Sequence, residues 1–284
     1  MGKKDACGVG FIANIKGIQS NWILKQSLKG LNCMEHRGGC GGDSDSGDGA
    51  GILCSIPWTF LDEEMNLGIK PESRRGLGMV FMPNNKKKIE ECKSICDEEA
   101  RKLSFRKTFW RTVPVENKVL GPLAKTNAPF ITQWILYIDK EDNQDIERIL
   151  FLLRKRIEKR IRETSKNQIV NCEFYFASLS SQTVVYKGMV RSEILSEFYQ
   201  DLKNDCFKVS FSVYHRRFST NTLPKWPLAQ PMRFLGHNGE INTLLGNINW
   251  AKASEKHIDD YWGKSSFDLK PIVDVNKSDS SNLD

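Results

Sequence analysis

Short apolar segments rich in β-branched residues alternate along the chain with segments in which apolar residues recur at helical spacing. The strand-like segments are residues 7–17, 48–56, 76–82, 109–115, 130–138, 173–180, 183–189 and 209–219. The helical patterns are residues 21–33, 86–103, 146–161 and 240–256, with a shorter one after Pro57. Because such elements must bury their apolar sides against facing layers, the alternation predicts one α/β or α+β domain with a two-sheet core.

Composition narrows the class of protein further. Hydrophobic residues make up 39% of the 284 residues, which is enough for a sizeable core and unlike a disordered chain. No run approaches the roughly 18 consecutive apolar residues of a membrane helix, which argues against a spanning protein. The net charge of +7 is spread thinly over the chain, so nucleic-acid binding has little support. The eight cysteines are scattered and no secretory signal precedes them, so we expect a reducing compartment and mostly buried thiols.

Two features with a possible binding role are interpreted structurally. The basic run at residues 154–162 lies largely opposite the apolar side of the 146–161 helix, so we expect a solvated helix face there. Cys92 and Cys96 lie four residues apart on a predicted helix, without a second Cys or His pair at ligand spacing. We therefore expect helix-face thiols and no metal site.

Cys7 opens the first strand-like segment. A cysteine in this position is ordinarily a small buried hydrophobic residue. Cleavage after Ala6 would leave the free α-amino group on Cys7, and an unperturbed α-amine has a pKa of about 7.7–8.0. Such an amine can take the thiol proton and act as a built-in general base.

Residues 214–242 and 278–284 contain the other polar candidates. The guanidinium of Arg217 could bind a carboxylate through two parallel hydrogen bonds. The side-chain amide of Asn238 and the backbone N–H of Gly239 could form a two-donor oxyanion site. Asp279 could bind an α-ammonium group. Taken singly, these residues are better explained as a surface ion pair, an Asn-Gly turn, and a helix cap or disordered tail.

Together, residues 7–13, 34–52, 214–243 and 277–284 resemble the class-II glutamine amidotransferases, a branch of the N-terminal-nucleophile hydrolases. The resemblance spans nearly the whole chain in the order of the family's motifs. It is closest to the amidotransferase domain at the N-terminus of glutamate synthases, because the chain contains the Trp-Pro-Leu-Ala-Gln-Pro segment at 226–231. The resemblance implies a four-layer αββα sandwich.

The resemblance also implies the catalytic residues. Cys7 matches the nucleophile that attacks the side-chain amide of glutamine, releases ammonia and leaves a γ-glutamyl thioester for water to hydrolyse. Asn238 and Gly239 match the oxyanion hole. Residues 1–6 are then a leader removed on maturation. The resemblance further implies that residues 7–284 form a glutamine amidotransferase domain, which we expect to be truncated at its C-terminus.

The remaining matched positions concern substrate binding. Arg217 matches the residue that binds the α-carboxylate of glutamine, and Thr220 lies beside it in the same loop. Asp279 matches the residue that binds the α-ammonium group. Residues 36–38 match a His-Arg-Gly motif, which we interpret as shaping the loop beneath the nucleophile.

In the complete enzymes of this kind, ammonia passes to an FMN-containing synthase domain that converts 2-oxoglutarate to glutamate. An iron–sulfur cluster lies in the electron path, and ferredoxin or a nicotinamide-linked reductase supplies the electrons. We expect no cofactor within this chain, and a location in the cytoplasm or plastid stroma. Two alternatives stay open: a non-catalytic or partner-binding fragment, and an amidotransferase with a different ammonia acceptor, such as a sugar phosphate.

Overall fold

The strands form two antiparallel sheets in the computed structural model, which describes residues 8–39, 43, 45–66, 74–138, 145–165, 174–218, 225–239, 241–275 and 277–284. The first sheet has the order β1 (Gly8–Ala13), β8 (Phe211–Arg216), β2 (Ala50–Ser55) and β7 (Thr183–Gly188). The second has the order β4 (Phe105–Thr112), β5 (Phe130–Ile138), β3 (Arg74–Met82) and β6 (Tyr175–Ser180). The predicted mixture of helices and strands with a two-sheet core is confirmed.

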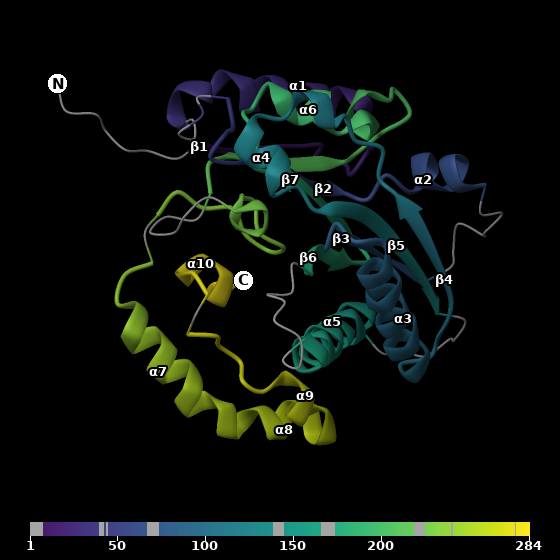
Figure 1. Cartoon of the computed structure of the whole chain (residues 1–284), viewed down its shortest axis with the longest axis vertical. Helices are drawn as coiled ribbons and strands as arrows, with labels where there is room; N and C mark the ends of the chain where they lie inside the picture. Colours follow the sequence, from purple (N-terminus) through teal and green to yellow (C-terminus); the bar gives the residue numbers. More distant parts are fainter. Residues whose placement is uncertain are drawn as a thin grey trace.

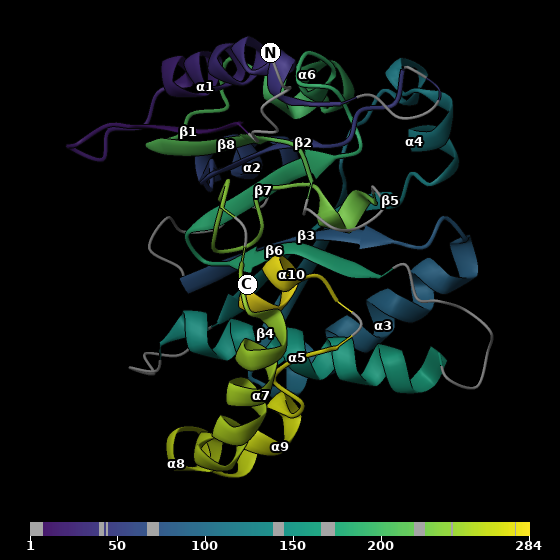
Figure 2. The ribbon, with the colours of Figure 1, turned by 90° about the vertical axis from the view of Figure 1, so that its left-hand side faces the viewer.

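Helices cover the outer sides of both sheets, as Figures 1 and 2 show. α1 (Asn21–Cys33) packs on β1 and β8 of the first sheet, whereas α3 (Lys86–Lys102) and α5 (Ile146–Ser165) pack on the second. The other helices are α2 (Trp58–Met65), α4 (Pro122–Thr126), α6 (Ile194–Phe198), α7 (Leu244–Ser254), α8 (Ile258–Trp262), α9 (Ser266–Leu269) and α10 (Asp279–Leu283).

The alternation of side chains along each strand creates two apolar cores, because successive residues of a strand point to opposite sides of its sheet. Leu77 and Phe81 of β3 belong to the core cluster that also contains Tyr186 of β7, so this core joins the two sheets. Val80 and Met82 point the other way and pack in the cluster formed with α3 and α5.

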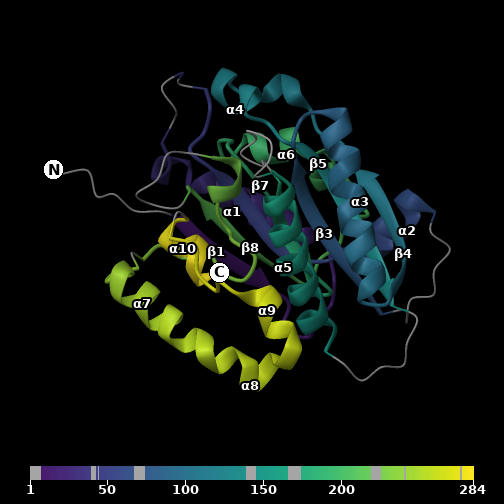
Figure 3. The same cartoon turned by 60° about the horizontal axis from the view of Figure 1, so that its bottom comes forward.

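α7 leads away from the sheets, and the chain returns through α8 and α9 to pack on α5 (Figure 3). Ile248 is the buried residue of α7, whereas Leu245 and Trp250 are each 77% exposed. Most of this helix therefore contributes little to either core.

The predicted bounds agree best where the apolar pattern is long. The helix at 21–33 and the strand at 130–138 are predicted with their observed bounds. β4 begins earlier than predicted, at Phe105, because this side chain is fully buried in the second core. α7 begins one turn later than predicted, at Leu244, and the chain continues after Ser254 as a 3-10 turn.

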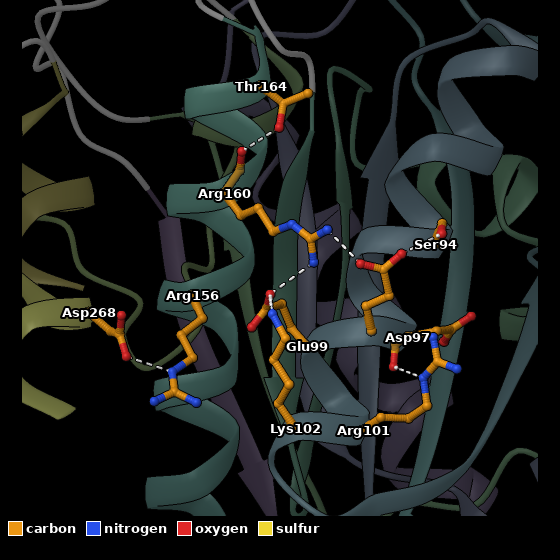
Figure 4. Close-up of polar contacts among 10 residues, drawn as sticks. Ser94, Asp97, Glu99, Arg101, Lys102, Arg156, Arg160, Thr164 and Asp268 are labelled. Atoms are coloured by element: carbon orange, nitrogen blue, oxygen red, sulfur yellow. Dashed lines mark hydrogen bonds and ion pairs between the residues drawn. The ribbon is translucent and has the colours of Figure 1, made fainter. Parts of the chain in front are cut away.

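The basic run of α5 differs from the expected solvated face. Arg160 lies 2.5 Å from Glu98 and 2.9 Å from Glu99 of α3. Arg156 lies 2.7 Å from Asp268 of α9, and Figure 4 shows both arginines reaching toward neighbouring helices. The solvated-face prediction is wrong here, because acidic side chains on adjacent helices pair with the run.

Cys92 and Cys96 lie on the buried side of α3, with exposed fractions of 6% and 0%. Burial raises the pKa of the Cys96 thiol well above its usual value. Cys54 is also buried, whereas Cys33 and Cys206 are exposed. Within the described ranges, no group of three or more His, Cys, Asp or Glu residues could hold a metal ion. The helices in those ranges include none long and apolar enough to cross a membrane.

Candidate active site

The register of the first sheet brings two of the motifs to one end of it. Gly8, directly after Cys7, pairs with Arg216, directly before Arg217. Cys7 itself lies outside the described residues, as does Thr220. The beginning of β1 and the end of β8 therefore lie side by side at one end of the sheet. The positions that the resemblance matches to the nucleophile and to the carboxylate-binding residue directly adjoin these two strand ends.

Arg216 is fully buried and binds the Gly-rich segment at this end of the first sheet. Its guanidinium pairs with Asp48, lies 3.1 Å from Glu35 and donates to the carbonyl of Gly49 at 2.8 Å. Burial would raise the pKa of Glu35, but its hydrogen bonds to Arg216 and Ser192 lower it overall. A side chain at Gly38 would overlap the Arg216 guanidinium, which gives the loop-shaping interpretation of residues 36–38 a physical basis.

Arg217 has an unusual backbone conformation, with φ of 124°. Residues other than glycine rarely adopt this region, and such strain costs on the order of 1–3 kcal/mol. Two hydrogen bonds hold it: the Arg217 N–H donates to Gly49 O at 2.8 Å, and Gln230 N–H donates to Arg217 O at 3.1 Å. Its Nε lies 3.4 Å from Asp48, and the side chain remains 26% exposed. Part of the Arg217 side chain is therefore accessible.

Asn238 and Gly239 are both exposed, on a segment whose backbone is tied to the sheet at His237. The His237 N–H donates to Gln230 Oε1 at 3.1 Å, and its carbonyl oxygen lies 2.9 Å from Nε2 of His215. The His237 ring lies 2.8 Å from Gly239 O through Nδ1. The segment thus presents the Asn238 side chain and the Gly239 backbone to solvent while the residue before them is fixed.

Asp279 begins α10 and is 9% exposed. The Ser278 hydroxyl accepts a hydrogen bond from the Ser281 N–H at 3.2 Å, so the helix-cap interpretation of this segment is confirmed and the disordered tail is wrong. The Ser280 hydroxyl lies 2.8 Å from Nε2 of His237. The structure therefore joins the acidic motif to the segment that carries Asn238 and Gly239.

Sequence reasoning missed two residues of this network, His215 and Gln230. His215 alternates with apolar neighbours in a strand pattern and looks like an ordinary core residue. Gln230 lies in the Trp-Pro-Leu-Ala-Gln-Pro segment, where it served only to support the resemblance. The signal that points to His215 is its place two residues before Arg217, on a strand that ends at the site.

Comparison with known proteins agrees with this arrangement. Residues 7–284 match the family described as glutamine amidotransferases class-II. The chain belongs to this family. The matched range begins at Cys7 and includes all four segments that carry the resemblance, so the class-II amidotransferase assignment made from the sequence is confirmed.

The relatives of this class-II amidotransferase include much longer proteins. Ferredoxin-dependent glutamate synthase 2 of Synechocystis sp. is 50% identical over 289 residues and covers 99% of this chain. The chloroplastic ferredoxin-dependent glutamate synthase of Oryza sativa subsp. japonica is 47% identical and covers 100% of it. Each alignment takes in 18% of the relative. The chain thus spans less than a fifth of the length of these relatives.

Proposed function

We propose that this chain is the glutamine-hydrolysing part of a glutamate synthase. It hydrolyses the side-chain amide of L-glutamine and passes ammonia to a synthase domain outside this sequence, which converts 2-oxoglutarate to glutamate. The observation that carries the proposal is the 2.8 Å contact between His237 and Ser280, which joins the candidate oxyanion donors to Asp279. The glutamate synthases at 45–50% identity favour this acceptor over a sugar phosphate.

The proposed reaction begins with Cys7 as the N-terminal residue. The α-amine takes the thiol proton, and the sulfur attacks the amide carbon of glutamine. The resulting oxyanion accepts hydrogen bonds from the Asn238 side-chain amide and the Gly239 N–H, each worth roughly 3–4 kcal/mol in the barrier. The C–N bond then breaks, the nitrogen takes the proton from the amine, and ammonia leaves a γ-glutamyl thioester. Water attacks the thioester to give glutamate and the free thiol.

Recognition of the zwitterionic end of glutamine needs one cation and one anion. Arg217 supplies the cation for the α-carboxylate in this proposal, with Thr220 beside it. Asp279 supplies the anion for the α-ammonium group. The partial exposure of Arg217 and the position of Asp279 at the start of α10 support these roles.

The proposed fold is the four-layer αββα sandwich of the N-terminal-nucleophile hydrolases. Two antiparallel sheets with helices on their outer sides support it. We propose the same domain organisation as above, with residues 1–6 removed as a leader and residues 7–284 forming the amidotransferase domain. The family match from Cys7 onward supports that processing site.

The described residues do not fit the iron–sulfur cluster that the longer enzymes imply. Cys92 and Cys96 are buried in α3, and no third His, Cys, Asp or Glu in the described ranges completes a ligand group with them. We assign the cluster and FMN to parts of a longer polypeptide. The names of the relatives favour ferredoxin over a nicotinamide-linked reductase as electron donor, and a plastid stroma or cytoplasm as location.

The test is the intact mass of the purified protein before and after treatment with a diazoketone analogue of glutamine. We expect a chain that starts at Cys7, gains one adduct and releases equal amounts of glutamate and ammonia from glutamine. Cys7→Ala should gain no adduct and release neither product. A correctly processed, folded chain that is neither labelled nor active would contradict the proposal and favour a non-catalytic fragment.

A further inference from the structure

His215 lies inside the first sheet and contacts the segment that carries the candidate oxyanion donors. It lies in β8 with an exposed fraction of 0%. Its Nε2 is 2.9 Å from the carbonyl oxygen of His237, whereas its buried Nδ1 has no hydrogen-bond partner among the described residues. One buried ring therefore contacts the segment proposed to form the oxyanion hole, from a strand position two residues before Arg217.

The protonation state of this ring follows from its partners. A carbonyl oxygen only accepts hydrogen bonds, so the Nε2 of His215 carries a proton and donates it to His237 O. Burial lowers the pKa of His215 to about 4, although its hydrogen bond with the His237 backbone opposes that change. The ring is therefore neutral near pH 7 and serves as a fixed donor. Because it is buried and already bonded, it is unsuited to exchanging protons with a substrate.

The hydrogen bond from His215 Nε2 acts on a single peptide group. The carbonyl of His237 belongs to the peptide that leads into Asn238, so a hydrogen bond to it fixes where the Asn238 backbone begins. The N–H on the other side of His237 is held by Gln230 at 3.1 Å. Arg217, in contrast, is anchored independently of His215 by Gly49 O and Gln230 N.

We propose that His215 is a positioning residue for glutamine hydrolysis, which holds the Asn238–Gly239 segment in the geometry that the oxyanion requires. This inference rests on the proposed function. It predicts a separation of kinetic effects: loss of the donor should impair the step in which the oxyanion forms, whereas glutamine binding through Arg217 should be preserved. A residue that merely fills space would not produce that separation.

The experiment compares His215→Leu with His215→Gln in the processed chain. Leu fills much of the same volume without a donor, whereas the Gln amide can place an N–H near the position of Nε2. A misplaced catalytic group costs about 10²-fold, so we expect His215→Leu to lower kcat by about 10²-fold with KM for glutamine within about threefold. His215→Gln should recover most of that loss. The exposed His257→Leu is the matched control and should leave both constants unchanged.

Equal losses in the Leu and Gln variants, or a KM change as large as the kcat change, would overturn the proposal. A second measurement does not depend on the variants' activity. The ring nitrogen spectrum of the 15N-labelled wild-type protein, which has four histidines, should show His215 as the neutral Nε2–H tautomer, assigned by its loss in His215→Gln. The other tautomer or an imidazolium would contradict the hydrogen bond on which the inference depends. If the wild-type chain does not hydrolyse glutamine, the proposed function itself is contradicted, and the positioning role of His215 is contradicted with it.

Discussion

Nε2 of His237 lies 2.8 Å from the hydroxyl of Ser280, a residue 43 positions later in the chain. The other ring nitrogen of His237 lies 2.8 Å from the carbonyl of Gly239, where it can only donate. In the neutral ring, Nε2 therefore accepts the Ser280 O–H. This ring sets the position of α10, and thus of Asp279, relative to the two candidate oxyanion donors.

Ser280→Ala should weaken glutamine binding by releasing α10 from this ring. A neutral hydrogen bond contributes about 0.5–1.5 kcal/mol, so KM for glutamine should rise by about two- to tenfold. Steady-state kinetics of the processed chain measure this effect, and Ser281→Ala, one residue further along α10, is the control. An unchanged KM in Ser280→Ala would show that Asp279 is placed without His237.

Asn238→Ala should lower kcat by about 10²–10³-fold, the usual effect of losing one oxyanion donor. Asn238 is exposed, so the free energy of unfolding should change by less than about 0.5 kcal/mol. Asn249→Ala removes the same group at an exposed position of α7, outside the candidate site, and should leave kcat unchanged. Kinetics paired with urea denaturation separate the two quantities. A large loss of stability with little change in kcat would assign Asn238 a structural role.

The sequence predicts the central elements of the fold because their apolar patterns are long. α1 and β5 are recovered in full, since burial recurs at helical spacing in α1 and β5 is a long run of buried side chains. α8 and α9 are missed because they are short and depend on tertiary contacts, such as the ring of Trp262 lying 5.7 Å from Phe151 of α5. The ion pairs of Arg160 are equally invisible in sequence, because they require knowing that α3 lies beside α5.

The sequence predicts the site residues that have distinctive chemistry. It does not predict the residues that hold the backbone of the site in place. Arg217, Asn238 and Asp279 carry groups that suggest a substrate or an oxyanion. His215 and Gln230 act on backbone atoms of other residues, and no local pattern records such a contact. The family resemblance identifies the motif that contains these two residues, but it does not predict the hydrogen bonds that they form.

Gly38→Ala should destabilise the protein, because its new Cβ would overlap the buried guanidinium of Arg216. Displacing Arg216 breaks its buried ion pair with Asp48, and breaking a buried ion pair costs up to about 3–5 kcal/mol. Gly39→Ala is the matched control, since its Cβ would lie 3.3 Å from an Asp48 oxygen and needs only a small shift. Urea denaturation of both variants checks this difference. Similar losses at the two positions would show that Arg216 can move without cost.

Glu158 of α5 should make stability depend on pH in the acid range. Burial alone would raise the pKa of Glu158, but the nearby cations Arg154, Arg233 and Lys277 lower it from 4.5 to about 2. A depressed carboxyl pKa stabilises the folded state above the unfolded value, and this contribution disappears as the pH falls from about 4.5 to about 2.

Glu158→Gln should therefore be less stable than wild type at pH 7, by on the order of 3 kcal/mol. The difference should shrink as the pH falls toward 2, where wild-type Glu158 also becomes neutral. Denaturation at a series of pH values measures it. Glu163→Gln, an exposed position of the same helix, should show no such convergence. A pH-independent difference for Glu158→Gln would mean that lost packing, and not lost charge, is responsible.

Arg217→Gly and Arg217→Ala should separate backbone strain from substrate binding. Both variants lose the guanidinium and its contact with Asp48, so KM for glutamine should rise at least about tenfold in each, as expected for a charged hydrogen bond. At φ of 124°, Ala remains strained whereas Gly does not, so Arg217→Gly should be more stable than Arg217→Ala by about 1 kcal/mol. Urea denaturation measures the difference, in which the lost side-chain contacts cancel. Equal stability of the two variants would show that the backbone relaxes when the side chain is removed. The conformation at Arg217 would then be imposed by its own side-chain contacts and not by its hydrogen bonds with Gly49 and Gln230.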